Sequence, residues 1–125
     1  MAQFQSGYEN ITYDNVAASV TGVAAATAAV TANGVRGTIA MGTATSWGNG
    51  TGRGFTLNNS SIQADSLINA CVIGRADDTN SVSPIPSHRI IWGIAAGTCK
   101  IGIVNATGGT IGTSDIVYVG FEVVN

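Results

Sequence analysis

Hydrophobic and polar residues alternate along several short stretches of the chain. In residues 35–41, apolar or small side chains alternate with Arg36, Thr38 and Ala40. The same period of two recurs in residues 99–103 and again in residues 115–124. This period is typical of a strand with one buried face and one solvated face. The pattern therefore predicts three half-buried β-strands.

Three further stretches favour strands on composition. Residues 53–57 place Phe55 and Leu57 two positions apart, and residues 89–95 (RIIWGIA) are rich in β-branched and aromatic side chains. Residues 66–75 (SLINACVIGR) form a mostly apolar run, which predicts a strand buried on both faces or at the centre of a sandwich.

Turn signals separate these segments. Residues 42–54 form a glycine-rich loop, and shorter turns are expected at residues 96–97 and 108–109. Residues 17–32 are rich in Ala, Val and Thr but carry no charge that could mark the solvated face of a helix, so we expect them to be extended. Short strands at roughly ten-residue spacing predict an all-β sandwich or barrel.

The first 16 residues differ from the rest of the chain. They show no clean periodicity but contain the aromatic residues Phe4, Tyr8 and Tyr13. We interpret residues 1–16 as an extended N-terminal arm that precedes a single β-sandwich domain, residues 17–125. Two interpretations of the aromatic side chains stay open: they anchor the arm in pockets of a partner, or they cover the core of their own domain.

Composition adds an argument for assembly. The chain has 125 residues, enough for one domain with its own core. Charged residues make up 10% of it and apolar residues 45%, whereas ~25% charge is usual. Because a free monomer keeps more charge on its surface for solubility, we expect part of this surface to be covered in an assembly.

The charges exclude several kinds of partner. The net charge is −2 and the five basic residues are scattered, so the sequence has no basic patch for nucleic acid or anionic lipid. No apolar run approaches the ~20 residues that span a bilayer. The N-terminal residues lack the basic and apolar regions of a signal peptide, so we expect synthesis and folding in a cytoplasm.

Candidate catalytic and metal-binding residues are few. His88 is the sole histidine; it follows Pro86 in a predicted surface loop, and no nucleophile motif accompanies it. Cys71 and Cys99 lack the spacing of a zinc site. In a cytoplasm they are expected to be small buried hydrophobic residues rather than a disulfide.

Other ligand motifs are incomplete. Asp77, Asp78 and Asn80 form an oxygen cluster that matches no EF-hand and reads as a solvated turn. The glycines of residues 48–54 lack the lysine of a phosphate-binding P-loop. Paired carboxylates of a glycan hydrolase are not recognisable either. We therefore expect no catalytic residue, no metal and no cofactor, and a protein that is not an enzyme.

The two tryptophans receive opposite predictions. Trp92 lies within the apolar segment 89–95 and is assigned to the core. Trp47 lies in a loop of Ser and Gly residues, which predicts an exposed side chain at a subunit interface or, less often, one that stacks on a sugar.

Residues 35–124 carry a family resemblance. A G-T-I-A-M strand at 37–41, the segment G-F-T-L-N-N-S-S-I-Q-A-D-S at 54–66 and residues 96–124, which end in V-G-F-E-V-V before the last residue, resemble the small β-sandwich module of tailed-bacteriophage virion proteins. Such modules occur as capsid decoration (cement) proteins and as distal domains of fibres. The resemblance implies a jelly-roll-like fold, a symmetric trimer, and binding to a capsid shell or a fibre stem. It brings no catalytic residues.

Together these arguments predict a jelly-roll-like antiparallel β-sandwich that acts as a capsid decoration protein. It would form homotrimers, bind the major capsid protein on the capsid surface of the virion, and stabilise the assembled shell. The residues predicted at capsid or subunit interfaces are Phe4, Tyr8, Tyr13 and Trp47. The alternative is a tail-fibre or receptor-binding tip domain.

Overall fold

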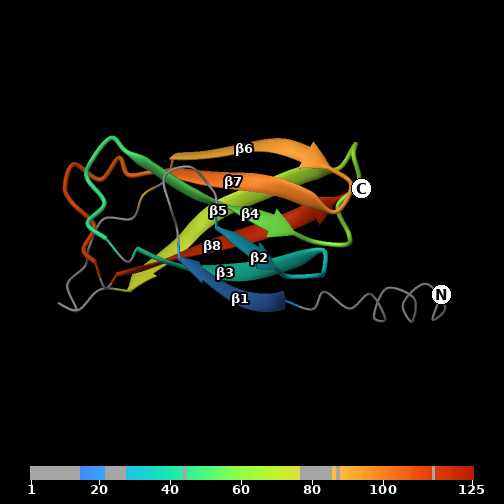
Figure 1. Ribbon diagram of the computed structural model, residues 1–125, viewed down its shortest axis with the longest axis horizontal. Helices are drawn as coiled ribbons and strands as arrows, with labels where there is room; N and C mark the ends of the chain where they lie inside the picture. The colour runs from blue at the N-terminus through green and yellow to red at the C-terminus, as the bar shows by residue number, and fades with distance from the viewer. Residues whose placement is uncertain (1–14, 22–27, 44, 77–85, 87, 114) are drawn as a thin grey trace, which may run out of the picture.

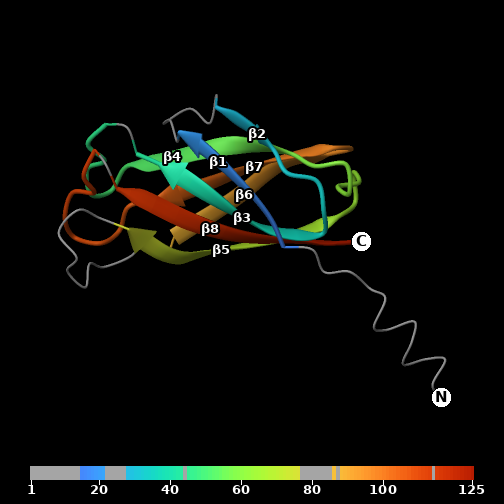
Figure 2. The same ribbon diagram turned by 90° about the horizontal axis from the view of Figure 1, so that it is seen from below.

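Two four-stranded sheets pack face to face in the computed structural model (Figures 1 and 2). The structure describes residues 15–21, 28–43, 45–76, 86, 88–113 and 115–125. Sheet A has the strand order β1-β3-β8-β5, and sheet B has the order β2-β4-β7-β6. The strands are β1 (Asn15–Thr21), β2 (Ala29–Thr31), β3 (Arg36–Gly42), β4 (Gly52–Asn58), β5 (Leu67–Ala76), β6 (His88–Ala95), β7 (Thr98–Val104) and β8 (Ile116–Val124).

The alternating segments form strands as predicted. β3, β7 and β8 fall within a residue or two of the expected ranges, and β3 and β8 alternate between buried and more exposed positions. In β7 the alternation is interrupted at Gly102, which is buried against Trp92. β1 and β2 confirm an extended conformation for the described part of residues 17–32. The all-β sandwich expected from strand spacing is therefore confirmed.

Strand direction differs from the prediction, because the sheets are mixed rather than antiparallel. β1 pairs parallel to β3, and β2 pairs parallel to β4, whereas the other ladders are antiparallel. The cause is that the chain changes sheet after each of the first five strands. Strands that pair within one sheet are then not consecutive, and a chain that leaves a sheet and returns to it can run in the original direction.

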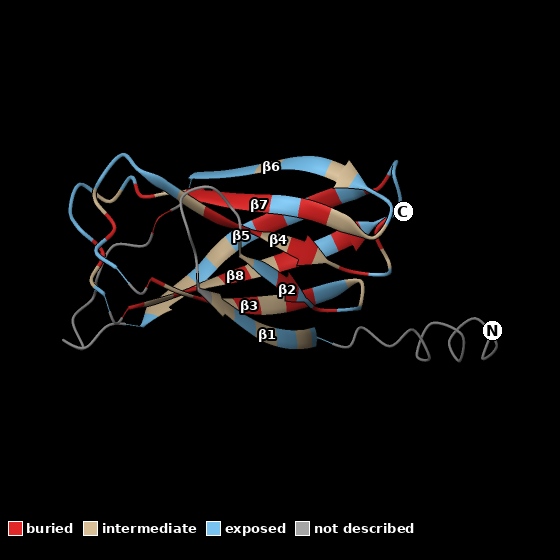
Figure 3. Cartoon of the chain, in the orientation of Figure 1, coloured by how far each residue is buried: buried red, intermediate tan, exposed pale blue. Residues whose placement is uncertain are grey.

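The core lies between the sheets. Its largest fully buried apolar side chains come from both sheets and from the loops at one end: Trp47, Phe55, Ile39, Met41, Leu57, Ile101, Ile103, Ile111, Val117 and Val119. Figure 3 shows buried residues alternating along β3 and β8, and a continuous buried stretch in β7. Removal of these side chains from water is the main favourable contribution to folding.

The prediction for residues 66–75 is wrong in one respect. β5 is buried on one face rather than two: Ile68 and Ala70 are buried, while Leu67, Asn69 and Cys71 are exposed. The reason is that no described element covers the outer face of sheet A. The prediction of a buried cysteine holds for Cys99 but not for Cys71, and both thiols are free.

Each strand at one edge of the sandwich, β5 and β6, contains a register shift. In β5 the shift lies between Val72 and Gly74, and in β6 it lies between Trp92 and Ala95. An extra residue in one strand turns all later side chains to the opposite face of the sheet. Gly93, within the shifted part of β6, has a φ of +63°, which glycine adopts readily.

The shift in β6 overturns the prediction for Trp92. The hairpin begins at Ala95, which pairs with Thr98, so without a shift Trp92 would stand opposite Ile101, a core position. With the shift it stands opposite Lys100, whose side chain is exposed. Trp92 is consequently 41% exposed on the outer face of sheet B.

Candidate functional site

Trp47 occupies the loop end of the sandwich, where the prediction of an exposed side chain is wrong. Its side chain is 0% exposed. The backbone N–H and C=O of Trp47 bond to those of Ile111, and the indole Nε1 donates to the carbonyl oxygen of Thr51 at 2.7 Å. The guanidinium of Arg53 lies 5.8 Å from the ring centroid, within the range of a cation–π contact. A glycine-rich loop can thus fold over its own aromatic side chain.

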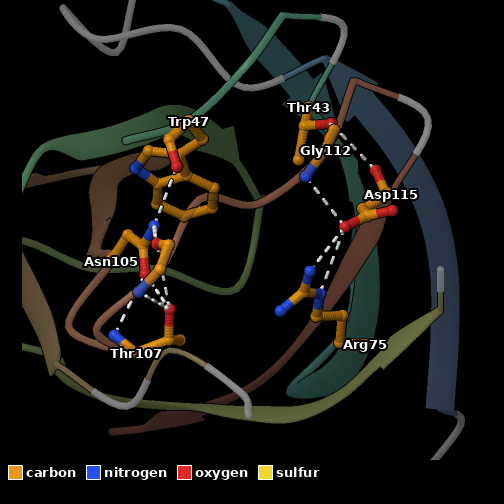
Figure 4. A network of polar contacts seen from close by, with 8 residues as sticks. Thr43, Trp47, Arg75, Asn105, Thr107, Gly112 and Asp115 are labelled. Carbon is orange, nitrogen blue, oxygen red and sulfur yellow. Dashed lines mark hydrogen bonds and ion pairs between the residues drawn. The ribbon is translucent and has the colours of Figure 1, made fainter. Parts of the chain in front are cut away.

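Asn105 connects the two loops at this end (Figure 4). Its Nδ2 donates to the carbonyl oxygens of Trp47 at 2.8 Å and Gly109 at 2.9 Å. Its Oδ1 accepts bonds from the backbone N–H and the hydroxyl of Thr107, at 3.1 and 2.7 Å. This fully buried amide therefore substitutes for the regular backbone bonding that the loops lack.

A buried ion pair joins the same end to β5. Asp115 Oδ2 lies 2.7 Å from a terminal nitrogen of Arg75, and the two side chains are 6% and 10% exposed. The same oxygen accepts the backbone N–H of Gly112 at 2.9 Å. Arg75 reaches this position because the register shift in β5 places it opposite Val117, on the inner face of sheet A.

These contacts make the loop end a structural network. Among the described residues, every buried side-chain nitrogen or oxygen has a hydrogen-bond partner. Within the same residues, no group of three or more His, Cys, Asp or Glu side chains is arranged to hold a metal ion. The polar groups of the network satisfy one another, which leaves the outer faces of the sheets as the surfaces open to a partner.

Exposed large apolar side chains gather toward one side of the sandwich. They are Leu67 and Ile73 of β5, Ile90 and Trp92 of β6, and Val124 of β8, the neighbour of β5. β5 and β6 are the edge strands that lie one above the other, and β6 is largely exposed in Figure 3. The opposite edge, made of β1 and β2, exposes small residues such as Ala17, Ser19 and Thr31.

The part of this surface on the outer side of β6 and β7 is called the β6 patch. Its members are His88, Ile90 and Trp92 of β6 with Lys100, Gly102 and Val104 of β7. Trp92 lies against Gly102, where an added Cβ would stand 2.9 Å from the indole ring. Beside it, a hollow of about 190 Å³ has Gly54 and Gly102 in its lining and Ile90 and Trp92 alongside.

All charged side chains in the strands of sheet B are positive. Its four strands contain Arg53, Arg89 and Lys100 and no aspartate or glutamate. Arg53 is engaged with the loop end, where it bonds Thr45 and Ser46. Lys100 is exposed opposite Trp92 on the outer face, so the β6 patch combines apolar groups with a positive one. Arg89 is also exposed, but it stands opposite Ile103 on the other face of β6 and extends to the hollow on sheet A.

A second, larger hollow of about 510 Å³ crosses the outer face of sheet A. Its lining is polar and apolar in similar measure; the polar part includes Arg36, Thr38, Asn69 and Glu122 and extends to Arg89 of β6. Asn69 and Glu122 contact each other at 3.4 Å across β5 and β8.

The residues predicted for the site have different outcomes. Phe4, Tyr8 and Tyr13 lie outside the described residues, as do Asp77, Asp78 and Asn80. Trp47 belongs to the core. His88 is exposed, as predicted, but it is the first residue of β6 rather than a loop residue. The prediction missed Trp92 because a register shift cannot be seen in the pattern of residues 89–95.

Comparisons of the chain with family models, with curated proteins and with solved structures found no match. In the part of the chain that the structure describes, no helix has the length and hydropathy required to cross a membrane. The function is therefore argued from the chemistry of the surface.

Proposed function

We propose that this protein is a structural component of a tailed-bacteriophage virion, a capsid decoration protein that associates with copies of itself and stabilises the assembled shell. The observation that carries the proposal is the β6 patch. Ile90 and Trp92 are 55% and 41% exposed on an edge strand. An exposed apolar edge favours pairing with another chain, and a protein that keeps one has a partner to cover it.

The fold agrees with the jelly-roll-like architecture that we propose for it. Strands β1 to β6 alternate between the two sheets, and β7 and β8 do so again. Strands that change sheet in this way are typical of jelly rolls, although the parallel pairs of β1 and β2 depart from their antiparallel ladders. The copies would form a homotrimer on the capsid surface.

The proposed action is mechanical, with the major capsid protein as the second partner and with no catalytic step. A protein that binds the assembled shell and not its separate subunits stabilises the shell by mass action. The expected consequence is a higher temperature of capsid disruption when the decoration protein is present.

The test is the number of copies per purified particle, measured by mass spectrometry against the major capsid protein. Hundreds of copies would support a decoration protein that covers the shell. Absence from particles would refute the proposal.

A handful of copies would favour the second candidate, a tail-fibre or receptor-binding tip domain. The exposed indole of Trp92 beside its hollow is the observation that favours this function, because aromatic faces stack on sugar rings. Binding to a defined glycan on an array, lost in Trp92→Ala, would support it.

A further inference from the structure

We propose that the free edge of β6 accepts residues 1–14 of a second copy as an added strand, so that copies join head to tail. The inference rests on the self-association in the proposed function and names the surfaces that produce it. Of the two interfaces predicted for Phe4, Tyr8 and Tyr13, it selects the one between subunits.

The receptor is β6, an edge strand that has a described neighbour on one side only. β6 pairs with β7 on one side, and no described strand pairs with its other side. Residues 88–92 keep a regular register with β7 before the shift. Half of the backbone N–H and C=O groups of such an edge point away from the sheet, where an extended segment can bond to them.

The side chains around this edge define what can bind. Ile90 and Trp92 are exposed apolar groups, and Arg89 and Lys100 are exposed cations. No strand of sheet B carries an acidic residue. A second β6 would bring its own arginine and lysine to the same surface. The complementary occupant is an extended segment with aromatic and acidic side chains.

Residues 1–14 have this chemistry. They contain Phe4, Tyr8 and Tyr13, the acids Glu9 and Asp14, and no lysine, arginine or proline. Ile11, Thr12 and Tyr13 are residue types with high β-propensity. Fourteen residues can span roughly 46 Å when extended, several times the length of the five-residue ladder at 88–92.

The position of Asn15 favours a segment from another copy. Asn15 begins β1, at the edge of sheet A opposite to β5, whereas β6 lies next to β5 at the other side of the sandwich, in sheet B (Figure 1). Reaching β6 of the same chain means crossing three strand spacings and one sheet spacing, roughly 24 Å in all. That distance takes about seven residues, which would include Glu9, Tyr13 and Asp14 and leave them away from the patch.

The resulting contact joins two different surfaces, the segment before β1 and the edge of β6. Such heterologous contacts close into rings when the rotation between copies allows it. They therefore suit a cyclic trimer, whereas a pairing of two β6 edges would produce a two-fold dimer.

The test uses the full chain with Cys71→Ser, which removes the exposed native thiol. Two variants, Asn10→Cys and Ile90→Cys, are purified separately, mixed, and treated with a short bis-maleimide. The expected result is a dimer cross-linked between one chain of each kind. The matched control replaces Ile90→Cys by Leu67→Cys, which is 68% exposed on β5 and should not cross-link. Absence of the mixed dimer would overturn the inference. So would a variant that carries both Asn10→Cys and Ile90→Cys and forms the cross-link only within single chains.

A second measurement needs no cross-linker. Ile90→Glu and Arg89→Glu should each weaken self-association about tenfold or more in sedimentation velocity, while Leu67→Glu should leave it unchanged. Circular dichroism checks that the variants are folded. If Ile90→Glu does not fold, Arg89→Glu still tests the inference. A synthetic peptide of residues 1–14 should dissociate the wild-type assembly by competition.

The two proposals fail in different ways. If Ile90→Glu and Arg89→Glu assemble like the wild type, the β6 edge is not the receptor, and the copy number in particles still decides the proposed function. If assembly depends on β6 but particles contain no copies, self-association stands and the decoration function falls.

Discussion

The two tryptophans mark regions of the molecule with opposite physical chemistry. Trp47 lies at the loop end, where its indole and backbone bonds are all made within the chain and its side chain is 0% exposed. Trp92 lies on the outer side of β6, where one neighbour is Gly102 and 41% of its surface faces solvent.

The difference shows how one residue type can serve stability in one place and recognition in another. At the loop end, Asn105, Arg75 and Asp115 satisfy the polar groups around the tryptophan, so the region resembles a core. At the β6 patch, apolar and positive groups stand beside a strand edge with which no described strand pairs. Changes in the first region should therefore act on folding, and changes in the second on association.

The largest expected effect is that of Trp47→Ala. Removing a fully buried tryptophan leaves a cavity and should lower the free energy of unfolding by about 3–5 kcal/mol. Urea denaturation followed by circular dichroism measures the loss. A loss below about 1 kcal/mol would contradict the assignment of Trp47 to the core.

Asp115→Ala should cause the second-largest loss of stability. It leaves Arg75 buried beside the vacated site and the N–H of Gly112 without its acceptor, at a cost of about 3 kcal/mol. Asp65→Ala, at an exposed position, is the matched control and should change stability by less than about 0.5 kcal/mol. Equal stability of the two variants in the same urea titration would show that the ion pair does not support the loop end.

Trp92→Ala should separate the two regions most clearly. Because its indole covers only Gly102 and neighbouring parts of sheet B, we expect a loss of about 1 kcal/mol in unfolding free energy. Self-association should weaken more, as measured by sedimentation velocity. If Trp92→Ala lost as much stability as Trp47→Ala but still associated, Trp92 would belong to the folding core and not to the association surface.

The smallest effects concern the two cysteines. Burial raises the pKa of the Cys99 thiol to about 11, whereas Cys71 is exposed. A thiol reagent at pH 8 should label one cysteine in the native protein and two in urea, with peptide mapping to locate the label. Rapid labelling of Cys99 in the native state would show that sheet B opens near β7.

The raised pKa of Cys99 also determines how the stability of the fold changes with pH. Between pH 9.0 and about 11 the unfolded chain loses the Cys99 proton while the folded chain keeps it. Stability from this group is thus complete below pH 9.0 and declines as the pH rises through that window. Cys99→Ala should reduce this part of the pH dependence in urea titrations.

Much of the secondary structure could be predicted from the sequence alone. Alternation around Arg36, Lys100 and Glu122 defines which side chains of β3, β7 and β8 face the core, because successive side chains of a strand point to opposite faces. Glycine and asparagine at the turns separated the strands. The low charge pointed to a covered surface but not to its location.

Strand direction and the accessible site depended on the tertiary structure. The alternation of Ala and Val in β1 is the same for a parallel or an antiparallel neighbour, so pairing with β3 could not be predicted from it. The loop around Trp47 became core because distant residues, Ile111 and Asn105, close over it.

The two register shifts determined which faces of the sheets Trp92 and Arg75 occupy. One extra residue in β6 turns Trp92 from the core to the outer face, and one in β5 turns Arg75 inward to Asp115. The residue pattern of a strand determines that its faces differ. Which face meets the core at each position is determined by the neighbouring strand, because a single unpaired residue inverts the alternation from that point onward.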